Sequence, residues 1–449
     1  MRNRDELANQ DIKKLLLRYT TPAMIGVLVA ALYNIVDRIY VGQLGALEMT
    51  GIGISMPLMQ ILLGFGMLIG IGAGARVSIR LGEGRQQDAE SVLGNAFVLL
   101  ILIPGAISII GLLFRDSLLY RFGADETTIG FARDYLTIIL YGSIFQGIGF
   151  GLNTVVRGEG FPKLAMYTQL LGAVTNIVLD PILIYGLGLG IRGAAIATVI
   201  SQFLSALWII YHFTRGPGVL RLTKESLRLR FHTILSIVSI GMSPFLMQLA
   251  SSLITVTMNN ALKATGGQIA ISAMTAIQAV ALFSLMPLFG INQGSQPIIG
   301  YNYGAANYKR VREATKYGVL IATAVSTFFF LAVQLFPQTI LGLFSSEPEF
   351  LQVAIPGARL VFLFLPLVGF QVFSANYFQA TGKAIVSGLL SLLRQVIVML
   401  PLLLILPSMI GLNGVWWALP LSDIVASAIT ALVMILEWKR LKRLEVHVV

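Results

Sequence analysis

The first long apolar segment of the chain ends in the stretch Asn34–Gly45, which reads NIVDRIYVGQLG and carries an acid at Asp37. An apolar segment of about 20 residues is long enough to cross a bilayer as a helix. A carboxylate at membrane depth is costly, and it is kept mainly where it faces a cavity or binds something. The stretch therefore predicts a membrane helix in which Asp37 has a functional role.

The composition supports a membrane protein along the whole chain. Of its 449 residues, 56% are hydrophobic and only 12% are charged, whereas soluble domains carry roughly 25% charged residues. No alternating polar and apolar pattern typical of a barrel is present, so we expect helices. Twelve apolar segments can be read, at approximately 15–41, 51–79, 92–114, 129–152, 163–186, 191–213, 233–262, 270–300, 317–340, 352–379, 385–408 and 413–438.

The distribution of basic residues predicts the orientation. Most of the 32 Lys and Arg residues lie in the loops that share a side with the N-terminus, and such loops are normally cytoplasmic. We therefore expect a multi-pass cell (inner) membrane protein, inserted in the lipid bilayer, with both termini in the cytoplasm. Because the net charge of +11 belongs to these loops, no nucleic-acid partner is expected. Because the N-terminus is charged and polar, we also expect no cleaved signal peptide.

The chain repeats itself at a nearly constant offset. At 222 residues, Gly45 meets Gly267, Gly72 meets Gly294, Gly82 meets Gly304 and Leu119 meets Leu341. Two parallel six-helix halves are typical of transporters that bind substrate between the halves near the midplane. The expected fold is an all-α membrane protein with twelve transmembrane helices in two pseudo-symmetric six-helix bundles. The N-terminal half covers residues 1–214, a cytoplasmic linker 215–231 and the C-terminal half 232–449.

Asp37 shares a helix face with Tyr33 and Asn34, so three polar groups meet there. A functional role is favoured because of the usual behaviour of intramembrane acids. The alternative is a structural ion pair with Arg38 or Arg394. Arg38 is the next residue in the sequence, so its side chain points elsewhere.

Asp180 has Asn176 four residues before it, and Pro181 leaves a backbone carbonyl free nearby. In the next helix Thr198 can add a hydroxyl. Carboxylates together with amide oxygens form a hard-oxygen environment that suits a proton or Na⁺. The alternative is that Asn176 and Asp180 merely bridge two helices.

A third acid, Asp423, has Arg394 as a plausible partner. An ion pair that locks the second half and a functional role are equally compatible with the sequence.

The repeat places the acids in one half only. At an offset of 222 Asp37 meets Asn259, and Asp180 meets Leu402. The acidic site therefore belongs to the first half, and polar residues of the second half such as Asn259 complete the cavity. Motifs for nucleotide, zinc-protease or hydrolase chemistry are missing from the sequence. We expect no cofactor and an ion gradient as the source of energy.

At these residues the chain resembles the multidrug and toxic compound extrusion (MATE) family. The resemblance rests on Asp37–Gly45, on the glycine-rich second and eighth helices and on Arg157-Gly158-Glu159-Gly160. It covers essentially all 449 residues. The acids of the N-terminal half resemble the DinF-type branch, and the acids of helices 7 and 10 that mark the NorM-type branch are missing.

The resemblance implies cation-coupled drug efflux through a cation site in the N-terminal half. The family pattern assigns that site to Asp37, Asn176, Asp180 and Thr198, with Tyr135 nearby. These four residues are also the ones expected to hold Na⁺ if Na⁺ is the coupling ion. Positions that line the family's cavity correspond to Tyr33, Asn153, Gln169 and Gln202. Asn34 and Asn259 join this substrate-binding group because of their polar positions beside Asp37 and at its repeat counterpart.

The expected protein is a monomeric antiporter, and not an enzyme. It would export amphipathic or cationic drug-like molecules in exchange for H⁺ or Na⁺ by alternating access. Two alternatives remain open. A flippase for lipid-linked sugars or other lipids would need several cationic side chains to hold a pyrophosphate, and only Arg38 and Arg394 are candidates. A membrane-embedded enzyme would have to use Asp37 and Asp180 as acid and base.

Overall fold

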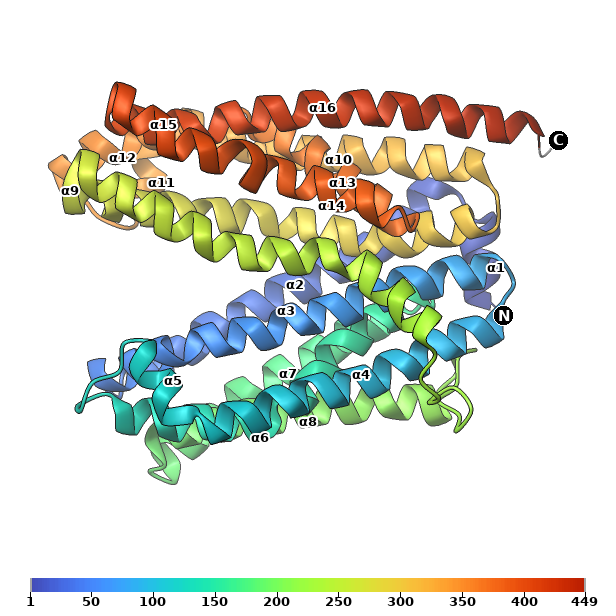
Figure 1. Ribbon diagram of the computed structural model, residues 1–449, viewed down its shortest axis with the longest axis horizontal. Helices are drawn as coiled ribbons and strands as arrows, with labels where there is room; N and C mark the ends of the chain where they lie inside the picture. Colours follow the sequence, from blue (N-terminus) through green and yellow to red (C-terminus); the bar gives the residue numbers. More distant parts are fainter. Residues whose placement is uncertain (1, 448–449) are drawn as a thin grey trace.

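The computed structural model describes residues 2–447, and within that range every regular element is a helix, with no strand. Figure 1 shows two groups of long, roughly parallel helices lying one above the other, with both termini at the same end. We call this end the terminal end, and the opposite end the open end. The fold is the all-α arrangement in two halves that the repeat predicted.

The N-terminal half contains six long helices, because Pro181 and the turn after it only interrupt the fifth. Its elements are α1 (Arg2–Asn9), α2 (Ile12–Gly42), α3 (Ala46–Gly82), α4 (Gln86–Leu113), α5 (Arg115–Arg121), α6 (Ile129–Gly158), α7 (Pro162–Pro181), the π-helical turn η1 (Ile182–Gly186) and α8 (Gly190–Arg215).

The C-terminal half begins with α9, a 74-residue helix that turns back at Gly267. Its elements are α9 (Phe231–Gly304), α10 (Tyr308–Leu335), α11 (Pro337–Gly342), α12 (Pro348–Val361), α13 (Leu365–Ala380), α14 (Ala384–Leu392), η2 (Leu393–Met399), α15 (Leu400–Ile410) and α16 (Leu412–His447). Ten helices of the described chain are long and apolar enough to span a membrane, and α12 with α13, bent by 48°, forms an eleventh span. The turn at Gly267 divides α9 in two and completes the twelve expected spans.

The backbone repeats between the halves in detail. Glycines with positive φ recur at Gly45 and Gly267, Gly160 and Gly382, and Gly190 and Gly411. Gly84 has a φ of 75°, and its counterpart in the second half is Ala306 with a φ of 55°. A non-glycine residue adopts this left-handed conformation at a cost, so the connection inherited from the repeat dictates the shape of this turn.

The first helix of each half begins by packing against the other half. Leu15 of α2 is fully buried in a core cluster formed mostly by helices of the C-terminal half. Its repeat counterpart, Ile237 of α9, is fully buried in the main core cluster of the N-terminal half. Each half is therefore held to the other at the terminal end by buried apolar surface.

Glycines bring α3 and α9 into close contact at the same end. A Cβ on Gly72 would lie 2.1 Å from the carbonyl oxygen of Ile237, and one on Gly241 would lie 1.7 Å from that of Leu68. Small residues of this kind let helix backbones approach closely in membranes. The contact continues toward the open end as far as Gln60 of α3, whose Oε1 accepts a 3.2 Å hydrogen bond from Gln248.

Gly72→Ala is expected to destabilise the protein, although alanine is the better helix former by about 1 kcal/mol. The new methyl group would overlap the Ile237 carbonyl, and overpacking typically costs about 1–3 kcal/mol. Gly53→Ala in the same helix is the matched control, because a Cβ there meets nothing within 4 Å. Thermal unfolding of both purified variants checks this. Equal melting temperatures would show that the helices can separate here at no cost.

The connection between the halves, residues 216–230, is bound to the N-terminal half along its length. Glu159 accepts hydrogen bonds from the backbone N–H groups of Val219 and Leu220 at 2.6 and 2.8 Å. The other carboxylate oxygen of Glu159 lies 2.8 Å from Nε2 of His212, and both side chains are buried. Asn95 of α4 donates to the carbonyl oxygen of Arg228 at 3.0 Å and accepts from the N–H of Arg230 at 2.8 Å.

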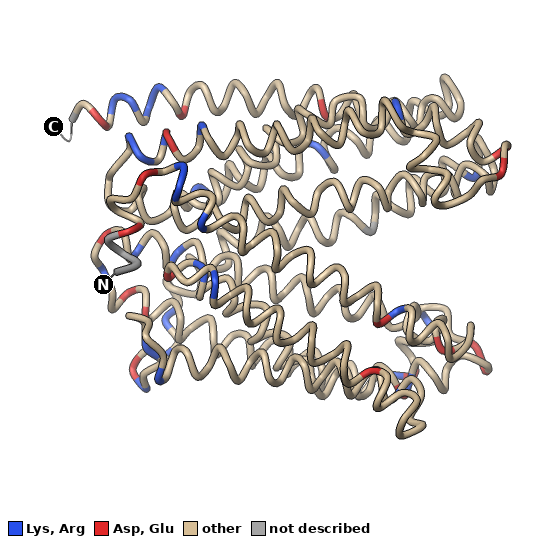
Figure 2. Tube along the Cα trace, turned by 180° about the vertical axis from the view of Figure 1, so that it is seen from behind, with Lys and Arg blue, Asp and Glu red and all other residues tan. Residues whose placement is uncertain are grey.

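Charged side chains are concentrated at the two ends of the molecule. Figure 2 shows Lys and Arg gathered mainly toward the end that carries both termini, with fewer at the open end. This agrees with the sequence pattern from which the orientation was inferred.

Candidate functional site

Asp37 and Asp180, separated by 143 positions in the sequence, lie side by side. Asp37 is half-buried in the last third of α2, and Asp180 is fully buried at the end of α7. Their carboxyl groups are close enough to interact directly. Two carboxylates in contact within a bilayer need a proton or a cation between them.

Neutral oxygens complete the surroundings of Asp180. Nδ2 of Asn176 lies 3.3 Å from Oδ1 of Asp180 and 3.5 Å from the Thr198 hydroxyl. Within the described chain, Oδ1 of Asn176 and Oδ2 of Asp180 are buried without a hydrogen-bond partner. Because buried polar atoms are normally paired, these two oxygens are available to a ligand.

Two tyrosines border the acids. Tyr33 lies one turn before Asp37 on α2, and Tyr135 of α6 is 3% exposed. Both are close enough to interact electrostatically with Asp37 and Asp180. Asn34 lies beside Tyr33 and donates a 2.6 Å hydrogen bond to the carbonyl oxygen of Ala30. The structure thus gathers these predicted residues around the acid pair.

The polar surface continues toward the terminal end through two glutamines. Gln202 lies one helical turn beyond Thr198 on α8, and its Oε1 is buried without a partner in the described chain. Gln169 lies two turns before Asn176 on α7 and packs against Gly26 of α2, where a Cβ would lie 1.9 Å from its Oε1. Both side chains share helix faces with the acid site.

Two other predicted residues lie apart from this group. Asn153 donates to the carbonyl oxygen of Ala165 at 3.0 Å and accepts from Arg157 at 2.6 Å, so its amide is engaged. Arg157 also bonds Gln293 of the other half, a contact that the sequence did not indicate. Asn259 is exposed on α9.

The ion pairs separate the alternatives considered for the acids. Nε of Arg394 lies 2.8 Å from Oδ1 of Asp423, which is 4% exposed, so this pair joins η2 to α16. Arg394 is therefore engaged within the C-terminal half and does not neutralise Asp37. Arg38 is exposed, and no ion pair of Asp37 occurs among residues 2–447.

The donor atoms define which ligands suit the site. Asp37, Asp180, Asn176 and Thr198 offer carboxylate, amide and hydroxyl oxygens, which are hard donors suited to H⁺ or Na⁺. In the part of the chain that the structure describes, no group of three or more His, Cys, Asp or Glu residues forms a metal cluster.

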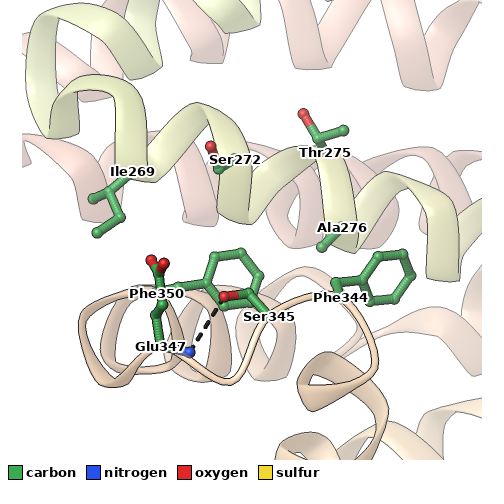
Figure 3. A pocket seen from close by; sticks show the side chains of 8 residues that line it. All are labelled: Ile269, Ser272, Thr275, Ala276, Phe344, Ser345, Glu347 and Phe350. Carbon is green, nitrogen blue, oxygen red and sulfur yellow. Dashed lines mark hydrogen bonds between the residues drawn. The ribbon is translucent and has the colours of Figure 1, made fainter.

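A separate cavity of about 380 Å³ lies at the open end of the C-terminal half, between α9 and the segment that leads into α12 (Figure 3). None of the residues around Asp37 lines it. It is lined by Ile269, Ser272, Thr275, Ala276, Phe344, Ser345, Glu347 and Phe350.

Comparison with known proteins assigns the chain to a family. The family model MatE matches residues 22–182 and 243–405, one segment in each half. The chain belongs to the MatE family. "Multidrug export protein MepA" of Staphylococcus haemolyticus (strain JCSC1435) is 28% identical over 417 residues, which cover 93% of this chain and 92% of the relative.

Solved structures agree with the MatE assignment. A structure described as "MATE in the bent conformation" superposes with a TM-score of 0.92, at 26% identity and 98% coverage of both chains. One described as an "outward-facing conformation of a multidrug resistance MATE family transporter of the MOP superfamily" gives 0.91, at 27% identity and again 98% coverage of both. The resemblance to the MATE family is confirmed, whereas the DinF-type branch stays a prediction, and the protein is a multi-pass membrane transporter, not an enzyme.

Proposed function

We propose that this MatE-family protein is a cation-coupled antiporter that exports amphipathic or cationic organic compounds in exchange for H⁺ or Na⁺. The observation that carries the proposal is the pair Asp37 and Asp180, with the unpartnered oxygens of Asn176 and Asp180 beside it. A cation can satisfy these groups, and a cationic substrate can compete for the same charge. The multidrug export protein of S. haemolyticus supports drug-like substrates.

The contacts between the halves support alternating access. From the terminal end to Gln60 and Gln248 the halves touch. Beyond that point, toward the open end, apolar side chains of α2 and α9 are more than half exposed, among them Leu32 and Val256. Figure 1 shows the two helix groups separating in the same direction. We interpret this as the state in which the site faces the open end.

The proposed cycle uses these two ends in turn. The basic terminal end faces the cytoplasm of the cell that carries the protein in its inner membrane, and the open end faces outward. In the outward state a cation binds Asp37 and Asp180 and substrate is released. The cation leaves when the halves rock to open the terminal end, where new substrate enters.

The flippase alternative is supported less well by the site. A pyrophosphate needs several free cationic groups. Arg394 is bound to Asp423, and Arg157 is bound to Asn153 and Gln293. The site therefore carries the negative charge of Asp37 and Asp180, which favours cationic ligands.

The proposal is tested with purified protein in proteoliposomes that contain ethidium, a cationic dye, at the same concentration inside and outside. An inwardly directed H⁺ or Na⁺ gradient is imposed, each in the absence of the other. We expect ethidium to leave against its own gradient under at least one of the two conditions. An ionophore that dissipates the same gradient is expected to stop it. Export that is indifferent to both gradients would contradict cation coupling.

A further inference from the structure

The segment of α2 that carries Asp37 is attached weakly to the rest of the protein. Buried residues of α2 end at Gly26 and resume only at Val41, so none of residues 27–40 is buried. Ile35 and Ile39, on either side of Asp37, are 55% and 53% exposed. Segments with few buried contacts move easily. Core packing therefore does not fix the position of Asp37.

At the end of this segment, α2 is attached by Tyr185 of η1. The Tyr185 hydroxyl donates a 2.7 Å hydrogen bond to the backbone carbonyl oxygen of Tyr40 and lies 3.1 Å from Oε1 of Gln43. The two tyrosine rings also meet edge to face, with centroids 6.4 Å apart. The bonded carbonyl lies three residues after Asp37, so the contact holds the turn that carries the acid. Val41, which is fully buried, and the neighbouring Tyr40 and Leu44 also pack against the core cluster that contains Ile184.

The residues on the other side of this contact are well fixed. Tyr185 lies five residues after Asp180, in the π-helical turn that follows Pro181. Ile184 is 2% exposed in a cluster with Tyr135. Gly193 of α8 packs so closely that a Cβ would lie 2.7 Å from the carbonyl of Leu183. Because η1 is held by α6 and α8, its tyrosine can impose a position on α2, and not the reverse.

We propose that Tyr185 is a positioning residue, whose hydroxyl ties the weakly packed end of α2 to η1 and thereby sets the approach of Asp37 to Asp180. One consequence rests on the proposed function: Tyr185 then regulates how tightly the coupling cation is held. Without the hydroxyl, α2 is free to leave η1, and the two carboxylates no longer meet in one fixed arrangement.

Tyr185→Phe removes the hydroxyl and keeps the ring, and the side chain is 44% exposed, so folding is not at risk. The chain contains no cysteine, so spin labels can be placed at Ile39→Cys on α2 and Leu187→Cys just after η1. We expect the distance distribution between the labels to broaden toward longer distances in Tyr185→Phe. Tyr141→Phe is the matched control, because Tyr141 is 69% exposed in α6. An unchanged distribution in Tyr185→Phe would overturn the proposal.

The second measurement is ethidium export from proteoliposomes as a function of the coupling cation. One hydrogen bond is worth about a fivefold change in an equilibrium. We therefore expect the cation concentration for half-maximal export to rise about fivefold in Tyr185→Phe, and less in Gln43→Ala, which keeps the Tyr40 carbonyl. A lower maximal rate with unchanged cation dependence would mean that the residue is only structural. If wild-type export needs no cation, the proposed function fails, whereas the label distances still decide whether Tyr185 ties α2 to η1.

Discussion

Replacing Asp37 by asparagine is expected to reduce cation-coupled export to the level of protein-free vesicles while leaving a folded, membrane-inserted protein. Asparagine has nearly the same shape, but it neither takes up a proton nor neutralises a bound cation at neutral pH. The site would then keep Asp180 as its only charge. Because Asp37 is half-buried in a weakly packed part of α2, its replacement removes little packing.

The measurement compares ethidium export by Asp37→Asn with that of Asp134→Asn, a partly exposed acid that pairs with Arg192 at the open end. The control is expected to export at the wild-type rate. Asp180→Asn should fail as Asp37→Asn does, and the double variant should be no worse than either, because residues that act as one unit are not additive. Full export by Asp37→Asn would refute the mechanism.

The second large effect is expected on stability, at the ion pair between Arg394 and Asp423. Asp423→Ala leaves the Arg394 guanidinium without its partner, at a position where the acid is 4% and the arginine side chain 21% exposed. Removing one member of a buried pair typically costs about 3–5 kcal/mol. We therefore expect poor yield and a clearly lower melting temperature for this variant.

The double variant Arg394→Met with Asp423→Leu separates the charge from the packing. Replacing both partners by apolar side chains of similar size is often neutral or stabilising, so this variant should recover most of the lost stability. Thermal unfolding of the three purified proteins gives the comparison. If Asp423→Ala has the melting temperature of the wild type, the Arg394 guanidinium reaches water and the ion pair does not stabilise the second half.

The twelve spans could be predicted because each depends on local composition. About 20 apolar residues suffice to identify a span, and the break expected between 262 and 270 coincides with the turn at Gly267. The repeat also aligned Leu119 with Leu341, and the structure places these two buried residues in the short helices α5 and α11. The bend between α12 and α13 could not be predicted, because hydropathy carries no information about the direction of a helix.

The candidate site was predictable only in part. Asn176 and Asp180 share a face at a spacing of four, so their proximity is a local property. The meeting of Asp37 with Asp180 depends on how α2 packs against α7, and only the family resemblance indicated it. Tyr185 was missed because residues five apart on an α-helix point in different directions, whereas a π-turn places them one above the other.

The connection between the halves has a mechanical consequence. Residues 216–230 are bonded to Glu159 and Asn95, and α9 continues against the N-terminal half through Ile237. The loop is therefore not a flexible linker, because it is held against the N-terminal half. We expect a rotation of one half to be absorbed within α9, which carries Gly241 and Pro244 inside the helix. A glycine and a proline lower the cost of bending a helix, so we expect this short piece of α9 to be the hinge between the halves.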